Sequence, residues 1–384
     1  MKNSRFKKLL KYRYIVYFLC LIAIYFIYDN YITPNQIDFC VHVYNNGVST
    51  GERGVFDLYS YNLFQLLLYL FYRIIKIPLK TSGIIILVFF EGIRLFFIDC
   101  VVSKHRKDWF LPILNCSLLF IMGIIGVSGV IYMGKGAGNI WHNTTYSALV
   151  PFSIMTLYYF KKIYIDETMS KKNLILLSIF MFISIVAKPS FMIAFLPSCF
   201  VYLVFEAIKN RDLLAFKNKI LTGILVSLPC LIYLLLEYVF TYKLGNSNSS
   251  IIIAPFAVWS ISSNNIVKSF VLGIAFSLCY FILNKKWKSK DFIFMAIMLV
   301  FGFSIFALFA ESGPRFADGN FGWTYNICGL MFQTYCVIDL YINKNIFKNK
   351  FIYYFCYFVY SMHFISGLIY VYQIVNHLAP YYNI

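Results

Sequence analysis

Two carboxylates and a guanidinium lie close together in the segment 311–323, which reads ESGPRFADGNFGW. An arginine fork binds a phosphate or pyrophosphate group through two parallel hydrogen bonds, which a lysine ammonium does not do as specifically. The glycines and Pro314 favour a tight, fixed backbone. We therefore expect Arg315 to bind a phosphate group, with Glu311 and Asp318 as further substrate contacts. An ion pair of Arg315 with either carboxylate is the structural alternative.

The segment 133–146 brings Lys135, His142 and Asn143 together among glycines. Glycines let backbone N–H groups approach an anion, and the N-terminus of a following helix attracts negative charge. These three residues are therefore predicted to bind phosphate and to position the substrate, and His142 can also transfer a proton. The alternative is an ordinary helix N-cap at Asn143.

A carboxylate, Asp38, lies a few residues beyond the first apolar run, in the loop 34–60. Lipid headgroups meet water at that depth, so a carboxylate there reaches a lipid-borne substrate without burial in hydrocarbon. It can act as general base on a hydroxyl group or hold a divalent cation such as Mg²⁺ or Mn²⁺. Asp38 is thus the predicted catalytic residue, and a solvated or helix-capping aspartate is the alternative.

Other charges lie within apolar runs or at their ends. Lys188, which precedes a proline, is a second predicted phosphate contact. The alternative is a lysine at a helix end that only extends its ammonium group to the membrane boundary. Glu91 and Arg94 are three residues apart, which predicts an ion pair on one face of a helix, either structural or part of a polar path. Glu237, near the end of its apolar run, is a weaker candidate for function.

The composition excludes a water-soluble fold. Of the 384 residues, 60% are hydrophobic and 13% are charged, whereas soluble proteins are about 45–50% apolar and about 25% charged. The ten cysteines contain no CxxC pair, so they are interpreted as small apolar residues. Cytosolic enzymes, disulfide scaffolds and disordered proteins are excluded together. The net charge of +18 comes from short basic clusters between apolar runs, which predicts membrane lipids as partners and no nucleic acid.

The chain is predicted to be an all-α polytopic membrane protein with about eleven transmembrane helices, within a range of ten to twelve. Residues 1–384 are expected to form a single integral membrane domain without a soluble domain. The run 61–79 contains two basic residues and a proline, and is predicted to be an outer interfacial helix that follows the first outer loop, so that loop and helix together cover 34–80. The expected spans are 14–33, 82–102, 111–132, 147–160, 173–187, 191–208, 220–240, 266–284, 291–310, 324–343 and 351–374.

Charge placement predicts the sidedness of these helices. With 61–79 in the interface, most of the 34 basic residues fall on the side of the N-terminus, which the positive-inside rule makes cytoplasmic. The loops that carry the candidate residues then face outward: 34–60, 133–146, 188–190, 241–265 and 311–323. The active site is therefore expected outside the cytoplasm. The composition, rich in Lys, Asn, Ile, Phe and Tyr, suggests an AT-rich bacterial genome and hence a bacterial cytoplasmic membrane.

The layout of the N-terminal half resembles a known family. The acidic Asp38 follows a first helix, and the stretch 61–73, YNLFQLLLYLFYR, precedes the next predicted helix. Over about residues 10–210 this order resembles the GT-C superfamily of membrane glycosyltransferases, in which an acidic residue of the first outer loop is catalytic. Many members carry a second acidic residue there, which would be Glu52 or Asp57 here.

The resemblance implies an inverting transfer of a sugar from a polyprenyl-phosphate donor to a glycan or lipid acceptor at the cell surface. The acidic residue of the first loop would take the proton of the acceptor hydroxyl. Arg315, with Lys135 or Lys188, would stabilise the departing phosphate, and His142 and Asn143 would position the substrate.

Two other functions fit the same sequence. A polysaccharide polymerase of the O-antigen or capsule type would act on polyprenyl-pyrophosphate oligosaccharides through Arg315 and His142. A flippase or transporter of lipid-linked glycans would need charges in a central cavity, for which Glu91 and Arg94 are deep enough. A membrane acyltransferase is a weaker alternative, because the expected His-centred motifs are not evident.

Overall fold

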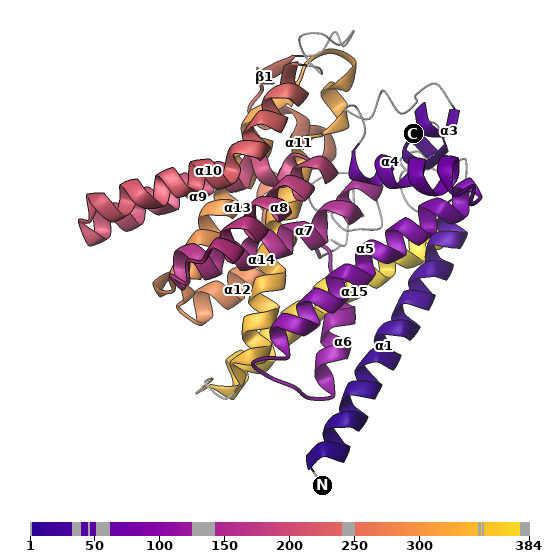
Figure 1. Cartoon of the computed structure of the whole chain (residues 1–384), viewed down its shortest axis with the longest axis horizontal. Helices are drawn as coiled ribbons and strands as arrows, with labels where there is room; N and C mark the ends of the chain where they lie inside the picture. Colours follow the sequence, from indigo (N-terminus) through magenta and orange to yellow (C-terminus); the bar gives the residue numbers. More distant parts are fainter. Residues whose placement is uncertain are drawn as a thin grey trace. The chain divides into compact units, whose positions relative to one another are not determined.

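The chain is almost entirely helical in a computed structural model, which describes residues 2–32, 40–44, 47–50, 62–124, 143–239, 250–344, 347 and 349–376 (Figure 1). The described helices form two compact units. The first unit comprises 1–123, 139–151 and 337–384, and the second comprises 124–138 and 152–336. Two helices, α7 (Thr144–Phe160) and α14 (Gly322–Ile342), begin in one unit and end in the other.

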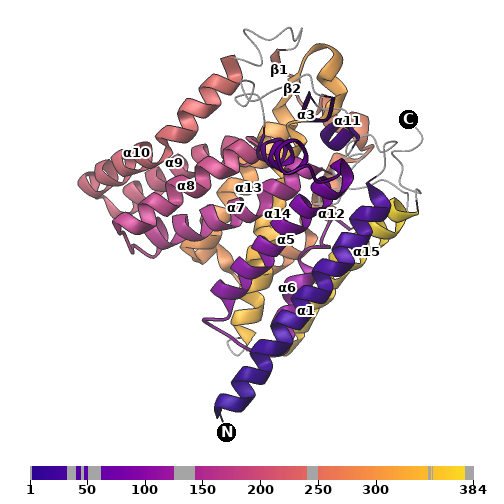
Figure 2. The ribbon, with the colours of Figure 1, turned by 45° about the vertical axis from the view of Figure 1, so that its right-hand side comes forward.

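The first unit contains the N-terminal and C-terminal helices. Besides parts of α7 and α14, it is built from α1 (Lys2–Tyr31), the π-helical turn η1 (Cys40–Tyr44), α3 (Gly47–Thr50), α4 (Leu63–Leu68), the π-helical turn η3 (Tyr69–Ile74), α5 (Leu79–Val102), α6 (Phe110–Ser117) and α15 (Lys350–Val375). Helix α1 packs along α5 and also contacts α6 and α15 (Figures 1 and 2).

A buried polar cluster holds α1 against its neighbours in the first unit. Arg13 forms an ion pair with Asp99 of α5, and the Tyr17 hydroxyl donates to the same carboxylate at 2.6 Å. The Asn115 side chain of α6 donates to the Leu95 carbonyl at 2.8 Å. Because each group would be costly to bury alone, the cluster fixes how the three helices pack.

A second polar cluster lies in the turn that follows α5. The Arg106 guanidinium lies 2.6 Å from the Asp108 carboxylate, and the Tyr341 hydroxyl donates to that carboxylate at 2.8 Å. Burial by itself would raise the pKa of Asp108, but the hydrogen bonds from Tyr341 and Arg106 outweigh it, so the pKa lies below its usual value.

The second unit is a bundle of antiparallel helices with a short sheet at one end (Figure 2). Helices α8, α9 and α10 pack against one another, and α13 packs on α9. Strand β1 pairs antiparallel with β2, with Ile251 opposite Glu311. Its elements are the π-helical turn η4 (Lys161–Ile165), α8 (Lys171–Ala187), α9 (Ser190–Asn210), α10 (Leu213–Tyr238), β1 (Ile251–Ile253), α11 (Ala257–Ser262), α12 (Ile266–Leu283), the 3₁₀ turn η6 (Lys286–Lys288), α13 (Lys290–Leu308), β2 (Phe309–Glu311) and the 3₁₀ turn η7 (Gly313–Asp318).

Local sequence explains where these helices begin. Ser170, Asp212 and Asn265 immediately precede α8, α10 and α12, and each side chain accepts a hydrogen bond from a backbone N–H of the first turn. Such N-caps satisfy donors that have no partner inside the helix. The interior of the unit is aromatic, with the Phe160 and Phe294 rings stacked at 4.3 Å between centroids.

Six helices in the described part of the chain are long and apolar enough to cross a membrane. They are Tyr12–Asn30 within α1, and α9, α10, α12, α13 and α15. Helix α10 is the most lipid-like of them, because only 17% of its apolar window is buried inside the protein. Length and composition therefore fit the predicted all-α class of membrane-embedded protein, with the short β1–β2 sheet as an addition to it.

The predicted count of eleven spans is not confirmed. Helix α5 meets the expected 82–102 but carries Glu91, Arg94 and Asp99, and α7 and α8 are only 17 residues long. Helix α14 is 21 residues long but is not among the six apolar ones. The clearest difference is the expected span 111–132, where α6 ends after eight residues at Ser117. Eight residues cover about 12 Å, far less than the hydrocarbon thickness of about 30 Å.

Beyond α6, the chain leaves the helical conformation and is hydrogen-bonded to α15. The Met122 N–H donates to the His363 carbonyl at 3.3 Å, and the His363 ring lies 2.6 Å from the Met122 carbonyl oxygen. Gly367 allows this approach, because a Cβ atom there would overlap the Phe120 carbonyl group. Non-helical backbone within an apolar environment requires such partners, so α15 makes the early end of α6 tolerable.

The segment expected at the interface forms a short helix. Elements α4 and η3 have six residues each, so together they extend about 18 Å and are too short to cross a bilayer. Asn62 and Gln65 form a capping box at its start, and the Arg73 side chain donates to the Val48 carbonyl at 2.9 Å. Its placement in a lipid interface stays a prediction.

Candidate functional site

A cavity of about 360 Å³ lies in the second unit, at the end that carries the β1–β2 sheet. Its charged and amide lining comes from three segments that are distant in sequence and consists of Lys188, Glu237, Glu311, Arg315 and Asn320. Its apolar lining includes Ile193, Leu234, Ile251 and Phe321. A cavity that combines apolar walls with a few converging charges is the usual form of a small-molecule site.

The end of α8 places Lys188 at the cavity. Lys188 has an extended backbone with φ −168° and ψ 130°, because the following Pro189 disfavours the helical conformation in the residue before it. Helix α9 then starts at Ser190 without a side-chain cap on its N-terminus, and both Pro189 and Ser190 line the cavity. The uncapped N–H groups and the helix dipole favour an anion there.

The β1–β2 sheet and the turn after it place the residues of the segment 311–323. Ser312 continues the pairing beyond Glu311 by donating its N–H to the Ser250 carbonyl at 2.8 Å. Gly313 and Gly319 have φ of 70° and 66°, a left-handed conformation that favours glycine, and they flank the turn η7. The backbone between them is therefore a compact turn that carries Arg315.

Arg315 is held by two carboxylates. Its Nη1 atom lies 3.2 Å from Glu311 Oε1, and its Nε atom lies 3.6 Å from Asp318 Oδ2. The Glu311 side chain is 4% exposed and also accepts a hydrogen bond from the Asn320 amide. The ion pairs left open as the structural alternative are thus present. They also orient the guanidinium, whose side chain is 42% exposed and lines the cavity.

Lys188 and Glu237 complete the charges of the cavity. The Lys188 ammonium lies 4.9 Å from the centre of the Trp323 ring and interacts electrostatically with Glu237. Glu237 lies in the last turn of α10, and its Oε2 atom is buried without a hydrogen-bond partner in the part of the chain that the structure describes. Glu237 is a weaker candidate from sequence, where its burial and its interaction with Lys188 are not visible.

The opposite end of the second unit is basic. Helix α8 has 17 residues, so about 25 Å separates Lys188 from the start of that helix. At that end Lys219 lies 3.0 Å from Glu167 and Lys290 lies 2.7 Å from Glu206. The hydrogen bond and charge of Lys219 lower the pKa of the exposed Glu167.

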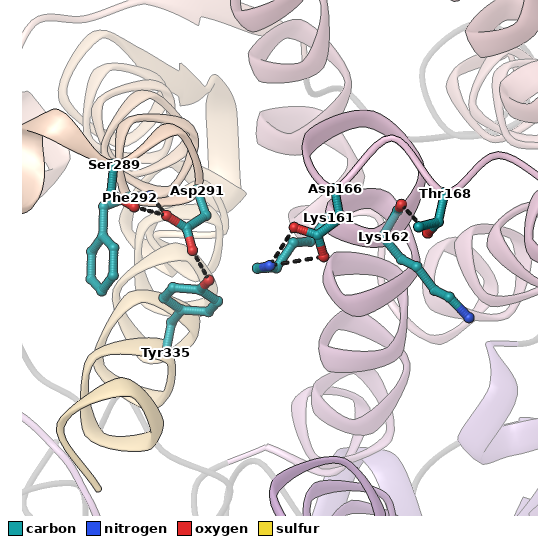
Figure 3. Close-up of polar contacts among 8 residues, drawn as sticks. All are labelled: Lys161, Lys162, Asp166, Thr168, Ser289, Asp291, Phe292 and Tyr335. Atoms are coloured by element: carbon teal, nitrogen blue, oxygen red, sulfur yellow. Dashed lines mark hydrogen bonds and ion pairs between the residues drawn. The ribbon is translucent and has the colours of Figure 1, made fainter. Parts of the chain in front are cut away.

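Figure 3 shows two further polar clusters of this basic end. Lys161 binds both oxygens of Asp166, at 2.7 and 2.9 Å. The Asp291 carboxylate accepts hydrogen bonds from the Tyr335 hydroxyl, the Ser289 hydroxyl and the Phe292 N–H. These carboxylates are occupied by contacts within the unit, so the end as a whole presents mostly lysine and arginine charges.

In the first unit, Asn143 acts as a helix cap. Its Oδ1 atom accepts a hydrogen bond from the Tyr146 N–H at 3.0 Å, and its Nδ2 atom lies 3.5 Å from the His42 ring. The N-cap interpretation of Asn143 is therefore confirmed. The predicted pair of Glu91 and Arg94 is also confirmed, with Nη1 3.8 Å from Oε2 and both side chains fully buried.

The predicted site residues fall into three groups. Lys188, Glu311 and Arg315 line the cavity of the second unit. Asp318 does not line it but forms an ion pair with Arg315. Asn143 belongs to the first unit. The remaining three, Asp38, Lys135 and His142, lie outside the described residues.

The predicted divalent cation also depends on Asp38. Among the residues that the structure describes, no group of three or more His, Cys, Asp or Glu side chains is arranged to hold a metal ion. The cation stays a prediction about the first outer loop.

In comparisons with known proteins, the chain matches no family model and no curated protein sequence. The resemblance to the GT-C superfamily thus depends on the layout of the N-terminal half alone.

Proposed function

We propose that the chain is a membrane glycosyltransferase that moves a sugar from a polyprenyl-phosphate donor to a glycan or lipid acceptor, using the cavity of the second unit. The observation that carries the proposal is the joint presence of Lys188, Arg315 and the uncapped start of α9 at the end of apolar helices. These groups suit one reactant in particular, an anionic headgroup carried on a hydrocarbon chain.

The charge of the leaving group is the first reason. When the bond between the sugar and the phosphate breaks, the electron pair stays on the phosphate oxygen, whose negative charge grows. Cations already in place stabilise that charge without reorganising. Arg315, oriented by Glu311 and Asp318, and Lys188 supply them.

The lipid tail is the second reason. Leu234 and Tyr238 of α10 line the cavity, while Leu231, Leu235 and Leu236 of the same helix are exposed on the surface of the protein. An apolar helix surface that continues into a charged cavity suits a substrate whose head lies among polar groups and whose tail stays in lipid.

The sidedness of the membrane is the third reason. The basic clusters of the second unit lie at the end opposite the cavity, and the positive-inside rule places a basic end in the cytoplasm. The cavity would then open to the outer leaflet, where surface glycans and lipids are the acceptors. The family resemblance alone assigns the acceptor proton to Asp38, which lies outside the described residues.

The test uses the full chain in lipid nanodiscs. Polyprenyl phosphates that carry radiolabelled glucose, mannose or galactose are incubated with an envelope lipid and glycan extract, and transfer of the label is measured. A parallel arm uses polyprenyl-pyrophosphate oligosaccharides. Transfer only in that arm would support the polymerase alternative, and no transfer in either arm would refute both enzymatic functions.

Matched variants link any transfer to the cavity. Lys188→Gln should raise the KM for the donor about ten-fold or more, because a hydrogen bond to a charged group contributes about 1.5–3 kcal/mol. Lys268→Gln is the control, because Lys268 is exposed in the same unit and is not part of the cavity lining. Equal effects of the two substitutions would contradict the proposed role of Lys188.

A further inference from the structure

We propose that Glu237 is the proton acceptor of the transfer reaction, an inference that rests on the proposed function. In the resemblance to the GT-C superfamily this role belongs to the first outer loop, whereas Glu237 lies at the end of α10 in the second unit. The geometry points to it through three independent features.

The first feature is the state of the carboxylate. Glu237 Oε2 is buried and has no hydrogen-bond partner among the described residues, although Glu237 lines the cavity. A buried carboxylate oxygen without a donor costs free energy unless something binds there. A ligand hydroxyl group that donates to Oε2 would supply the missing partner and would at the same time be in position to lose its proton.

The second feature is the contrast with Glu311, the other carboxylate of the cavity lining. Both oxygens of Glu311 are engaged, one by Arg315 at 3.2 Å and the other by the Asn320 amide. A carboxylate with both oxygens engaged has none left to receive a proton from a substrate hydroxyl, whereas Glu237 keeps an oxygen for the substrate. The two carboxylates therefore have separate roles, Glu311 in orienting Arg315 and Glu237 in accepting a proton.

The third feature is the position relative to the phosphate-binding groups. Lys188 interacts electrostatically with Glu237 and lines the same cavity as Arg315. The Lys188 ammonium stabilises the ionised carboxylate in the resting protein and the phosphate during reaction. The proposed base and the leaving-group contacts thus line one cavity, where a sugar bound by its phosphate would lie within reach of both.

Atoms and electrons balance in the proposed glycosyl transfer. The acceptor hydroxyl oxygen forms a bond to the anomeric carbon of the sugar, and the bond from that carbon to the phosphate oxygen breaks with its electron pair on the phosphate. The hydroxyl proton passes to Glu237 Oε2 and then to water. The products are the glycosylated acceptor and the polyprenyl phosphate, and no oxidant or cofactor is required.

The experiment compares Glu237→Gln with Asp38→Asn in the nanodisc assay described above. Glu237→Gln should lower kcat at least 100-fold, because a positioned general base contributes about 10²–10⁴-fold. Its binding of unlabelled polyprenyl phosphate should be unchanged or tighter, because a negative charge near an anion is removed. Glu167→Gln, an exposed carboxylate at the basic end, is the control with unchanged activity.

The pH dependence separates a base from a structural residue. In the wild type, kcat should fall at acid pH as the base becomes protonated, and the residual activity of Glu237→Gln should lack this acid limb. The other titratable groups that face Glu237 are Lys188, Arg315 and Glu311 from the facing segments and Tyr233 and Tyr238 from α10 itself. Glu237→Asp should restore part of the activity together with the acid limb.

Three results would overturn the inference. Wild-type turnover with Glu237→Gln at full rate would remove Glu237 and leave the transferase function intact. An acid limb that persists in Glu237→Gln and disappears in Asp38→Asn would assign the base to Asp38. No turnover by the wild type with any donor would overturn the function and this inference together.

Discussion

Gly367→Ala should destabilise the first unit, although alanine is the better helix former. In α15 this glycine faces the non-helical segment after α6, and an added Cβ atom would fall on the Phe120 carbonyl oxygen and 2.5 Å from its carbon. Carbon atoms in contact lie about 3.5–4.0 Å apart, so the segment has to move by at least about 1 Å. That movement strains the hydrogen bonds between Met122 and His363.

The magnitude follows from these contacts. Alanine in place of glycine contributes about 1 kcal/mol of helix propensity. Against it stand overpacking, at about 1–3 kcal/mol, and two weakened hydrogen bonds, at about 1 kcal/mol each. The expected net loss is about 2–4 kcal/mol, with the Met122 contacts as its main cause.

Gly92→Ala is the matched control in the same unit. Gly92 also lies inside a helix, α5, but its added Cβ atom would meet only a Leu21 methyl group at 3.7 Å, an ordinary contact. Both variants are heated in detergent, and the surviving monodisperse protein is measured by size-exclusion chromatography. Gly367→Ala should lose several degrees in Tm relative to Gly92→Ala. A Gly367→Ala protein as stable as the control would refute the close approach of α15 to the segment that follows α6.

Three further substitutions test other parts of the structure. Arg13→Gln should cost about 3–5 kcal/mol, because it leaves Asp99 buried without its charged partner; a change in Tm no larger than for an exposed pair would contradict this. Asp108→Asn should remove a contribution to stability that is present above the unfolded-state pKa of about 3.9 and is lost as the pH falls through the lower folded-state pKa. The difference in Tm between Asp108→Asn and wild type should therefore shrink from pH 6 to pH 3, and a constant difference would point to the Tyr341 contact alone. Arg315→Lys should raise the donor KM about ten-fold, since the fork is lost, with little change in Tm because its ion pairs are partly exposed; an unchanged KM would exclude Arg315 from the donor site.

Local sequence determined the class of the protein and several contacts. Apolar runs of sufficient length predicted membrane helices, and six of them are present in the described residues. The spacing of Glu91 and Arg94 predicted their ion pair, because residues three apart share a helix face. Asn143 before a helix predicted a cap, and the glycines and proline around Arg315 predicted a tight turn. Each of these features depends on neighbours within a few residues.

Tertiary structure decided where helices stop and which charges meet. The run 111–132 is apolar enough to continue as a helix, yet α6 ends at Ser117 because α15 offers partners for the backbone beyond it. Hydropathy counts the apolar side chains of a run and does not register a hydrogen-bond partner 241 residues away. For this reason hydropathy could not predict the early end of α6, and the predicted count of about eleven spans is not confirmed.

The cavity depends on tertiary structure for the same reason. Lys188, Glu237 and Arg315 belong to segments separated by long apolar helices, and only the packing of α8, α9, α10 and the β1–β2 sheet brings them to one place. Sequence identified the first and third from their chemistry, but the weight of Glu237 came from its burial beside Lys188. Burial and ion pairing depend on which side chains pack together between helices. Local sequence propensity therefore does not predict them.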